Sequence, residues 1–297
     1  MAAQATIETG RLRPYRTDAV VSHDGTTISY RVFGSGPGVV ILHGTMSSAY
    51  NHEQLAEALA DAFTVYVPDR RGRLLSGPYG SRYCVAREVE DLAALVARTD
   101  AKAVFGVSSG GIIALRAAVE LPAIRKAAIF EPPLFMDERT VDGFVARYDD
   151  EIAEGKTAAA LVTAMRGAQM GPPIFNAMPR WLTERLVAMM LKQEDRKGAG
   201  AYVPMRALAP TLHYDFALVQ ETRREPRPLD QISADVLLMG GSKSPAYLKA
   251  ALDRLETLLP SAARVELADC DHAASWNADR GGHPAAVAAA LRRFFAE

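Results

Sequence analysis

The residues most able to do chemistry in this sequence are a serine flanked by glycines and a histidine near the C-terminal end. Gly106-Val107-Ser108-Ser109-Gly110 follows a short apolar run and precedes apolar residues at helical spacing. Glycines around a serine permit a tight turn from strand to helix, and this turn exposes the serine hydroxyl. We therefore predict Ser108 as a nucleophile. The alternative is a glycine-rich turn in which the serine only caps the helix.

A serine nucleophile needs a base, and an imidazole suits this role because its pKa lies near neutral pH. The sequence contains six histidines, of which two follow the last predicted strand, Val265–Leu267. His272 lies in the loop directly after this strand, whereas His283 precedes Pro284 at the start of the final helix. The sequence therefore predicts His272 as the base and leaves His283 as the alternative.

The elements that must position these residues alternate between strand and helix in the first 130 residues. Apolar runs at helical spacing separate short β-rich runs, which are Ala19–Ser22, Thr26–Phe33, Val39–Leu42, Phe63–Val67, Ala103–Phe105 and Ala127–Phe130. Several of the runs are apolar at every position, as in strands that are buried on both faces. This alternation predicts a mostly parallel sheet with right-handed crossovers and helices on both faces.

The alternation stops between about Pro132 and Pro228, where the apolar residues follow only helical spacing. Strand patterns resume at Val236–Met239, and another strand and a closing helix follow. We therefore predict a helical insertion in an α/β domain. The expected core spans residues 17–133 and 229–297, the expected helical cap spans 134–228, and residues 1–16 form an N-terminal lead-in.

Five segments taken together in this order resemble the α/β-hydrolase superfamily. They are Leu42-His43-Gly44, Asp69-Arg70-Arg71-Gly72, the Ser108 pentapeptide, Glu131-Pro132-Pro133 and His272. The chain looks most like the capped bacterial serine hydrolases with a Glu-Pro-Pro segment after the sixth core strand. The resemblance runs from about Asp18 to Phe295 and implies the α/β-hydrolase fold with an inserted helical cap. Arg73-Leu74-Leu75-Ser76 departs from the family's usual glycine-rich, histidine-containing loop.

The resemblance also indicates where the acid of a catalytic triad lies. Its usual place is the loop after the seventh strand, but here residues 240–245 contain no carboxylate. The superfamily's second solution is an acid at the end of the sixth strand, where Glu131 stands. Pro132 favours an extended backbone at Glu131, which suits a carboxylate at the tip of a strand. Asp215 and Asp253 remain alternatives, whereas Asp271 is adjacent to His272 and poorly placed.

Two backbone N–H groups, those of Thr45 and Ser109, are implied as donors for an oxyanion. We expect His43 to make structural hydrogen bonds under this loop. From the insertion we predict that apolar and aromatic side chains line a substrate pocket, namely Met165, Trp181, Met189 and Tyr214. We interpret the nearby cluster of Arg70, Arg71 and Arg73 as part of a solvated loop.

Charge and composition exclude several classes of binding partner. The formal charge is −1, from 34 basic and 35 acidic residues, which argues against nucleic acid or an acidic membrane as a partner. Cys84 and Cys270 form no metal or disulfide motif, and no apolar stretch resembles a signal peptide or a membrane span. We expect a cytoplasmic protein that acts on a small molecule without metal or organic cofactor; a homodimer stays open.

The function that these residues favour is hydrolysis of an ester or a lactone by a serine enzyme. Thioester, amide and carbon–carbon cleavage use the same groups and stay open. A second hypothesis is a protein that keeps the hydrolase fold to sense a ligand, because the acid after the seventh strand is missing. A third is a lyase or a cyclisation catalyst on the same scaffold.

Overall fold

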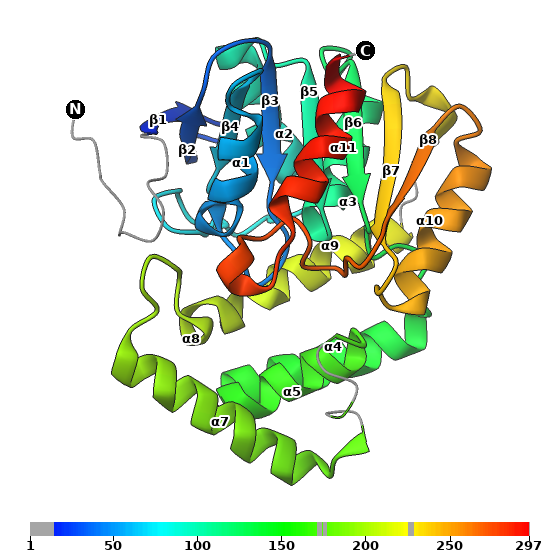
Figure 1. Cartoon of the computed structure of the whole chain (residues 1–297). Coiled ribbons are helices and arrows are strands. Elements are labelled where there is room, and N and C mark those ends of the chain that lie inside the picture. The colour runs from blue at the N-terminus through cyan, green and yellow to red at the C-terminus, as the bar shows by residue number, and fades with distance from the viewer. Residues whose placement is uncertain (1–14, 171–173, 175–176, 225–228, 297) are drawn as a thin grey trace.

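The computed structural model describes residues 15–170, 174, 177–224 and 229–296 (Figure 1). Its central sheet has eight strands in the order β1-β2-β4-β3-β5-β6-β7-β8. The bounds are Arg16–Val21 (β1), Thr27–Phe33 (β2), Gly38–Leu42 (β3), Thr64–Pro68 (β4), Ala103–Val107 (β5), Lys126–Phe130 (β6), Asp235–Gly241 (β7) and Ala263–Leu267 (β8). Strand β2 pairs antiparallel with both neighbours, and all pairs from β4 to β8 are parallel.

Helices cover both faces of the sheet because its central strands are apolar on both sides. All five residues of β5 are buried, and neighbouring residues point to opposite faces. Val104 packs in the core on the face of α2 (Val85–Thr99), α3 (Ser109–Glu120) and α10 (Ala246–Leu258). Phe105 packs in the core on the face of α1 (Glu53–Leu59) and α11 (Pro284–Ala296). The result is a three-layer α/β/α domain.

A group of helices lies between β6 and β7 in the sequence and faces the carboxyl ends of the strands in space (Figure 1). Its members are α4 (Glu138–Ala153), α5 (Thr157–Gly167), α7 (Arg180–Lys197), α8 (Met205–Leu208) and α9 (Leu212–Arg224). Helix α9 returns to the core and packs against α3. Residues of the cap, such as Leu161 and Phe216, line a cavity together with residues at the strand ends. No helix within the described ranges combines the length and apolar character needed to cross a membrane.

The expected N-terminal lead-in lies outside the described residues except for Tyr15 and Arg16. Tyr15 packs its ring against Phe33 at a centroid distance of 5.1 Å, and Arg16 already belongs to β1. The first strand therefore begins three residues before the predicted strand and one residue before the predicted start of the core.

The interpretation of the arginine cluster as a solvated loop is wrong. Arg70, Arg71 and Arg73 are 3%, 0% and 3% exposed. Arg71, for example, donates through Nη2 and Nε to the two carboxylate oxygens of Asp91, at 2.6 and 2.7 Å. A bidentate carboxylate satisfies a buried guanidinium. The carboxylate partners of the three arginines lie at least 18 residues away in sequence, where the local composition of the loop does not reveal them.

His52 is a buried imidazole from which a pH dependence of stability follows. Its Nδ1 donates to the carbonyl oxygen of Ser275 at 3.0 Å, and its Nε2 is buried without a partner among the described atoms. Burial lowers its pKa from the ordinary 6.5 to about 4. Between these two pH values the imidazole is protonated in the unfolded chain and neutral in the folded chain. The free energy of unfolding therefore falls by about 3 kcal/mol as the pH falls from 6.5 to 4.

We expect His52→Gln to flatten the acid limb of the stability profile, because glutamine keeps a donor but does not titrate. The measurement is the free energy of unfolding in urea for both proteins at pH 4.5 and 7. A loss on acidification that is equal in the two proteins would assign the acid sensitivity to other groups.

Candidate active site

The turn from β5 to α3 holds Ser108 in an unusual backbone conformation, with φ of 56° and ψ of −124°. The N–H of Ser108 donates to the carbonyl oxygen of Phe130 in β6 at 2.9 Å. The flanking glycines make the turn sterically feasible. A Cβ on Gly106 would lie 2.2 Å from the Gly110 carbonyl oxygen, and a Cβ on Gly110 would lie 2.3 Å from that of Leu42. The sequence around Ser108 is thus a strained strand-to-helix turn that presents its hydroxyl.

The tight contact at Gly110 leads to a prediction about stability. Gly110→Ala places a methyl group against backbone atoms, which cannot move aside as a flexible side chain can. We therefore expect the free energy of unfolding to fall by at least about 1–3 kcal/mol. Gly143→Ala is the matched control, because a Cβ there meets nothing within 4 Å in helix α4. Alanine in an open helix interior adds up to about 1 kcal/mol. Urea unfolding of both variants tests the contrast; equal stabilities would refute the close packing of the turn.

His272 and Glu131 form a hydrogen-bonded pair at the carboxyl edge of the sheet. His272 donates from Nδ1 to Oε2 of Glu131 at 2.7 Å, and Oε1 of Glu131 accepts the N–H of Gly241 at 2.7 Å. Glu131 is fully buried. A carboxylate only accepts hydrogen bonds, so the proton of neutral His272 lies on Nδ1 and its Nε2 carries none.

The backbone of Glu131 differs from the expectation. Its φ is 45°, in the left-handed region, rather than extended. The bias imposed by Pro132 is small, and here the N–H of Glu131 donates to the Met239 carbonyl oxygen while its carboxylate makes the two bonds just described. The loop that usually carries the acid instead makes room for it, since a Cβ on Gly240 would lie 3.0 Å from Oε1 of Glu131.

The alternative residues lie elsewhere. The side chain of His283 is exposed, at the start of α11, and Asp253 has an exposed side chain that pairs with Arg264. Lys243, in the loop after β7, pairs with Asp269 at 2.9 Å. Among the described side chains, the structure brings Glu131 and not Asp253 or Asp215 to the ring of His272.

The two residues whose backbone N–H groups are predicted to bind an oxyanion lie next to Ser108. Thr45 and Ser109 line the same cavity as Ser108. The N–H of Ser109 belongs to the first turn of α3, where it has no partner within the helix, and the helix dipole favours negative charge there. Gly44 permits the close approach of the Thr45 loop, because a Cβ on Gly44 would lie 2.8 Å from that of Ser108.

His43 supports this loop and is kept neutral. Its Nδ1 donates to the Gly44 carbonyl oxygen at 3.0 Å, and its Nε2 accepts the N–H of Arg70 at 3.2 Å. Burial lowers the pKa of His43 well below its ordinary value, and the charges of Arg70 and Arg73 lower it further. A neutral ring can serve as both donor and acceptor, and this fixes the loop that carries Thr45.

Asp215 is part of a buried ionic network behind the nucleophile. Its Oδ1 accepts from Arg70 Nη1 at 2.9 Å and from the Ser109 hydroxyl at 2.8 Å, and its Oδ2 accepts from Arg73 Nη2 at 2.8 Å. Arg70 also pairs with Glu88 at 2.7 Å. Two arginines and two carboxylates balance in charge, so the network fastens α9 to the core without a net buried charge.

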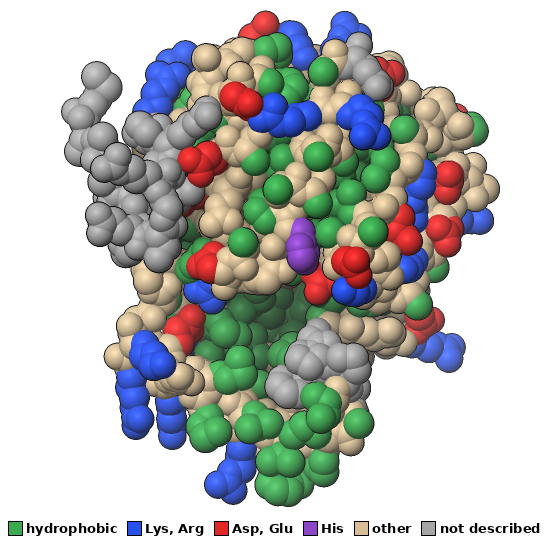
Figure 2. Space-filling model, in the orientation of Figure 1, with side chains coloured by type: hydrophobic (Ala, Val, Ile, Leu, Met, Phe, Trp, Pro, Cys, Tyr) green, Lys and Arg blue, Asp and Glu red, His purple; other side chains and the backbone are tan. Residues whose placement is uncertain are grey.

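The catalytic cavity, which contains Ser108 and His272, has a volume of about 270 Å³ and lies between the cap and the strand ends. Figure 2 shows a hollow there whose visible wall is mostly hydrophobic. Most of the lining residues are apolar, such as Met165, Phe216 and Val219. Within the described ranges no group of three His, Cys, Asp or Glu side chains is placed to hold a metal ion.

The predicted pocket residues divide into two sets. Met165 lines the cavity, but Trp181, Met189 and Tyr214 do not. Trp181 and Met189 are 61% and 63% exposed on α7, and Tyr214 stacks on Tyr79 at a centroid distance of 3.4 Å. Residue type alone does not tell which face of a cap helix looks inward.

Tyr247 is a polar residue of the cavity that sequence reasoning missed. Burial raises the pKa of its hydroxyl, and the charge of Glu131 raises it further, so it remains a donor at neutral pH. It lies at the start of α10, directly after the loop that follows β7, and this position at the carboxyl end of a strand could have identified it.

Comparison with known families and with solved structures points to the same fold family. A family model described as "Alpha/beta hydrolase family" matches residues 39–290. The crystal structure of an alpha/beta hydrolase from Sphaerobacter thermophilus superposes with a TM-score of 0.74 and is 34% identical, and the match covers 94% of this chain and 100% of that chain.

Curated sequences are more distant. A 2-(acetamidomethylene)succinate hydrolase from Mesorhizobium japonicum is 25% identical over 256 residues, which cover 83% of this chain and 85% of the relative. An uncharacterized hydrolase from Bacillus subtilis, YraK, is 33% identical over 116 residues. That match covers 38% of this chain and 43% of YraK, so it spans less than half of the relative's length.

Proposed function

The chain belongs to the alpha/beta hydrolase family, and from this premise we propose that it is a serine hydrolase that cleaves an ester or a lactone of a small, mostly apolar molecule. The observation that carries the proposal is the strained turn that presents Ser108 to the cavity lined by His272. The buried Glu131 carboxylate on Nδ1 of His272 supports it, because it fixes the tautomer that a base requires.

The reaction proceeds through an acyl-enzyme. The oxygen of Ser108 attacks the substrate carbonyl carbon while Nε2 of His272 accepts the hydroxyl proton, and Glu131 stabilises the imidazolium. The carbonyl oxygen becomes an oxyanion that the N–H groups of Thr45 and Ser109 bind. The leaving group departs with the proton from His272. His272 then accepts a proton from water as the water attacks the acyl carbon, and it returns this proton to the departing oxygen of Ser108 when the acid is released.

The charge of the cavity favours a neutral substrate. Among its described lining residues the charged side chain is that of Asp215, whose two oxygens are already bound by Arg70 and Arg73, and no lysine or arginine is present. The relative from Mesorhizobium japonicum is named for a succinate derivative. A dicarboxylate of that kind would lack a cationic partner in this cavity, so we propose that the present substrate lacks such groups.

A panel of chromogenic substrates tests the function. We would measure kcat/KM for 4-nitrophenyl esters, for lactones, and for matched amides and thioesters, each with wild-type protein and with Ser108→Ala. Ester or lactone turnover that exceeds amide turnover and disappears in the variant supports the proposal. Tight ligand binding without product from any of these substrates would favour the ligand-sensing alternative, which keeps the fold but not the reaction.

A further inference from the structure

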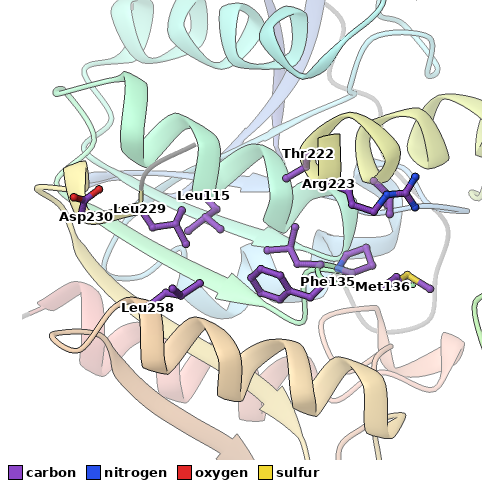
Figure 3. Close-up of a pocket in the computed structure, with 11 residues that line it drawn as sticks. Leu115, Phe135, Met136, Thr222, Arg223, Leu229, Asp230 and Leu258 are labelled. Carbon is purple, nitrogen blue, oxygen red and sulfur yellow. The ribbon is translucent and has the colours of Figure 1, made fainter. Parts of the chain in front are cut away.

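A second cavity, here called the hinge cavity, lies where residues 133–136 leave β6 for the cap (Figure 3). Its volume is about 550 Å³. Its walls come from α3, α9, α10 and the hinge segment itself, and the main apolar side chains are Leu115, Leu134, Phe135, Val219, Leu229 and Leu258. It is therefore larger than the catalytic cavity and equally apolar in character.

The apolar walls of the hinge cavity are incompletely covered. Phe135 is 53% exposed and Leu258 is 40% exposed, so both present apolar surface at the rim of the cavity. Figure 3 places Arg223 and Asp230 at opposite ends, with Phe135 and Leu258 between them. Arg223 already pairs with Asp142 at 2.9 Å. Aliphatic surface, rather than a charged group, is thus the chemistry that this cavity complements.

The fold imposes the position of Phe135. Its φ is 59°, in the left-handed region that bulky residues rarely adopt. Such a conformation persists only where the surrounding structure over-determines it, and it is often found at ligand-binding sites. The backbone of Phe135 therefore departs from its local preference at a residue that lines the cavity.

The two cavities adjoin. Pro133 of the hinge and Val219 of α9 line both of them. Leu115 of the hinge cavity lies six residues after Ser109 on α3, which is about 9 Å along the helix axis. A chain attached to Ser108 would have to pass between Pro133 and Val219 to end beside Leu115.

We propose that the hinge cavity binds the distal part of a long aliphatic acyl chain whose carbonyl group is held at Ser108. This inference rests on the proposed function and specifies its substrate class as esters of medium to long fatty acids. The catalytic cavity, at about 270 Å³, takes the proximal carbons, and the hinge cavity takes the remainder.

A chain-length series tests this assignment. We expect kcat/KM of the wild type to rise from butanoyl to dodecanoyl 4-nitrophenyl esters, measured below their micellar concentrations. Leu258→Trp fills the hinge cavity from its exposed rim, and we expect at least about a tenfold loss for the dodecanoyl ester, since each buried methylene contributes about fourfold. The butanoyl ester should stay within about twofold of wild type. Leu75→Trp is the matched control, because Leu75 is exposed and lines neither cavity.

Further arms separate the outcomes. Phe135→Ala, also at an exposed position, should give a smaller loss that is again confined to long chains. Long-ester rates that are unchanged in both variants, or equal losses for short and long esters, would overturn the assignment while butanoyl turnover keeps the proposed function. A length dependence on the alcohol of acetate esters instead would overturn the acyl assignment. Lactone turnover without turnover of any ester would overturn this inference and keep the proposed function, and absence of turnover with every ester and lactone would refute both proposals.

Discussion

Ser108→Ala is expected to lower kcat by at least about 10⁴-fold while the protein melts at nearly the wild-type temperature. This loss corresponds to about 5 kcal/mol of transition-state stabilisation, because removal of the nucleophile leaves only binding and the oxyanion donors. The N–H of Ser108, which donates to Phe130 in β6, is unaffected by the change. A fluorophosphonate probe should label the wild type at Ser108 and should not label the variant.

Ser109→Ala identifies which of the two adjacent serines reacts. The hydroxyl of Ser109 donates to Asp215 and accepts from Arg70, behind the strand-to-helix turn at Ser108. The proposed role of Ser109 in the reaction belongs to its backbone N–H. We therefore expect Ser109→Ala to keep probe labelling. Labelling that disappears in this variant and survives in Ser108→Ala would reverse the assignment.

The α/β-hydrolase fold was predictable from sequence and is confirmed, because its signals are local. Each buried strand is a short apolar run, and the two glycines that flank Ser108 lie where a Cβ would clash with backbone atoms. Such constraints act over a few residues and leave a pattern that can be read directly. The same holds for the break in alternation between β6 and β7, where the structure has only helices among its described elements.

Other features depend on partners far away in sequence and were not predictable. Arg70 and Arg73 have the sequence character of loop residues, and they are buried because Asp215 of α9, more than 140 positions later, pairs with both. Trp181 and Met189 have the composition of a pocket but lie on the outer side of α7. In both cases the orientation of a cap helix against the core determines which side chains are buried, and the periodicity of apolar residues in the sequence does not specify this orientation.

The Glu131–His272 pair should behave as one unit in a double-mutant cycle. His272→Ala removes the base, so we expect a loss in kcat of at least about 10⁴-fold. Glu131→Gln keeps size and hydrogen bonding but removes the charge that stabilises the imidazolium, and we expect at least about a hundredfold loss, or roughly 3 kcal/mol. His283→Ala, at an exposed position away from the cavity, should keep most of the activity.

The double variant discriminates between a positioning role and an independent one. Glu131 is not among the described residues that line the cavity, and its carboxylate contacts Nδ1 of His272 at 2.7 Å, so in the proposed mechanism it acts through this ring. Once the ring is absent, the carboxylate has nothing to orient, so we expect the double variant to be no slower than His272→Ala. Glu131→Asp should recover only part of the rate, because the shorter side chain cannot contact both the ring and the N–H of Gly241. If instead the two losses multiplied, Glu131 would act on the substrate directly, and another group would have to orient His272.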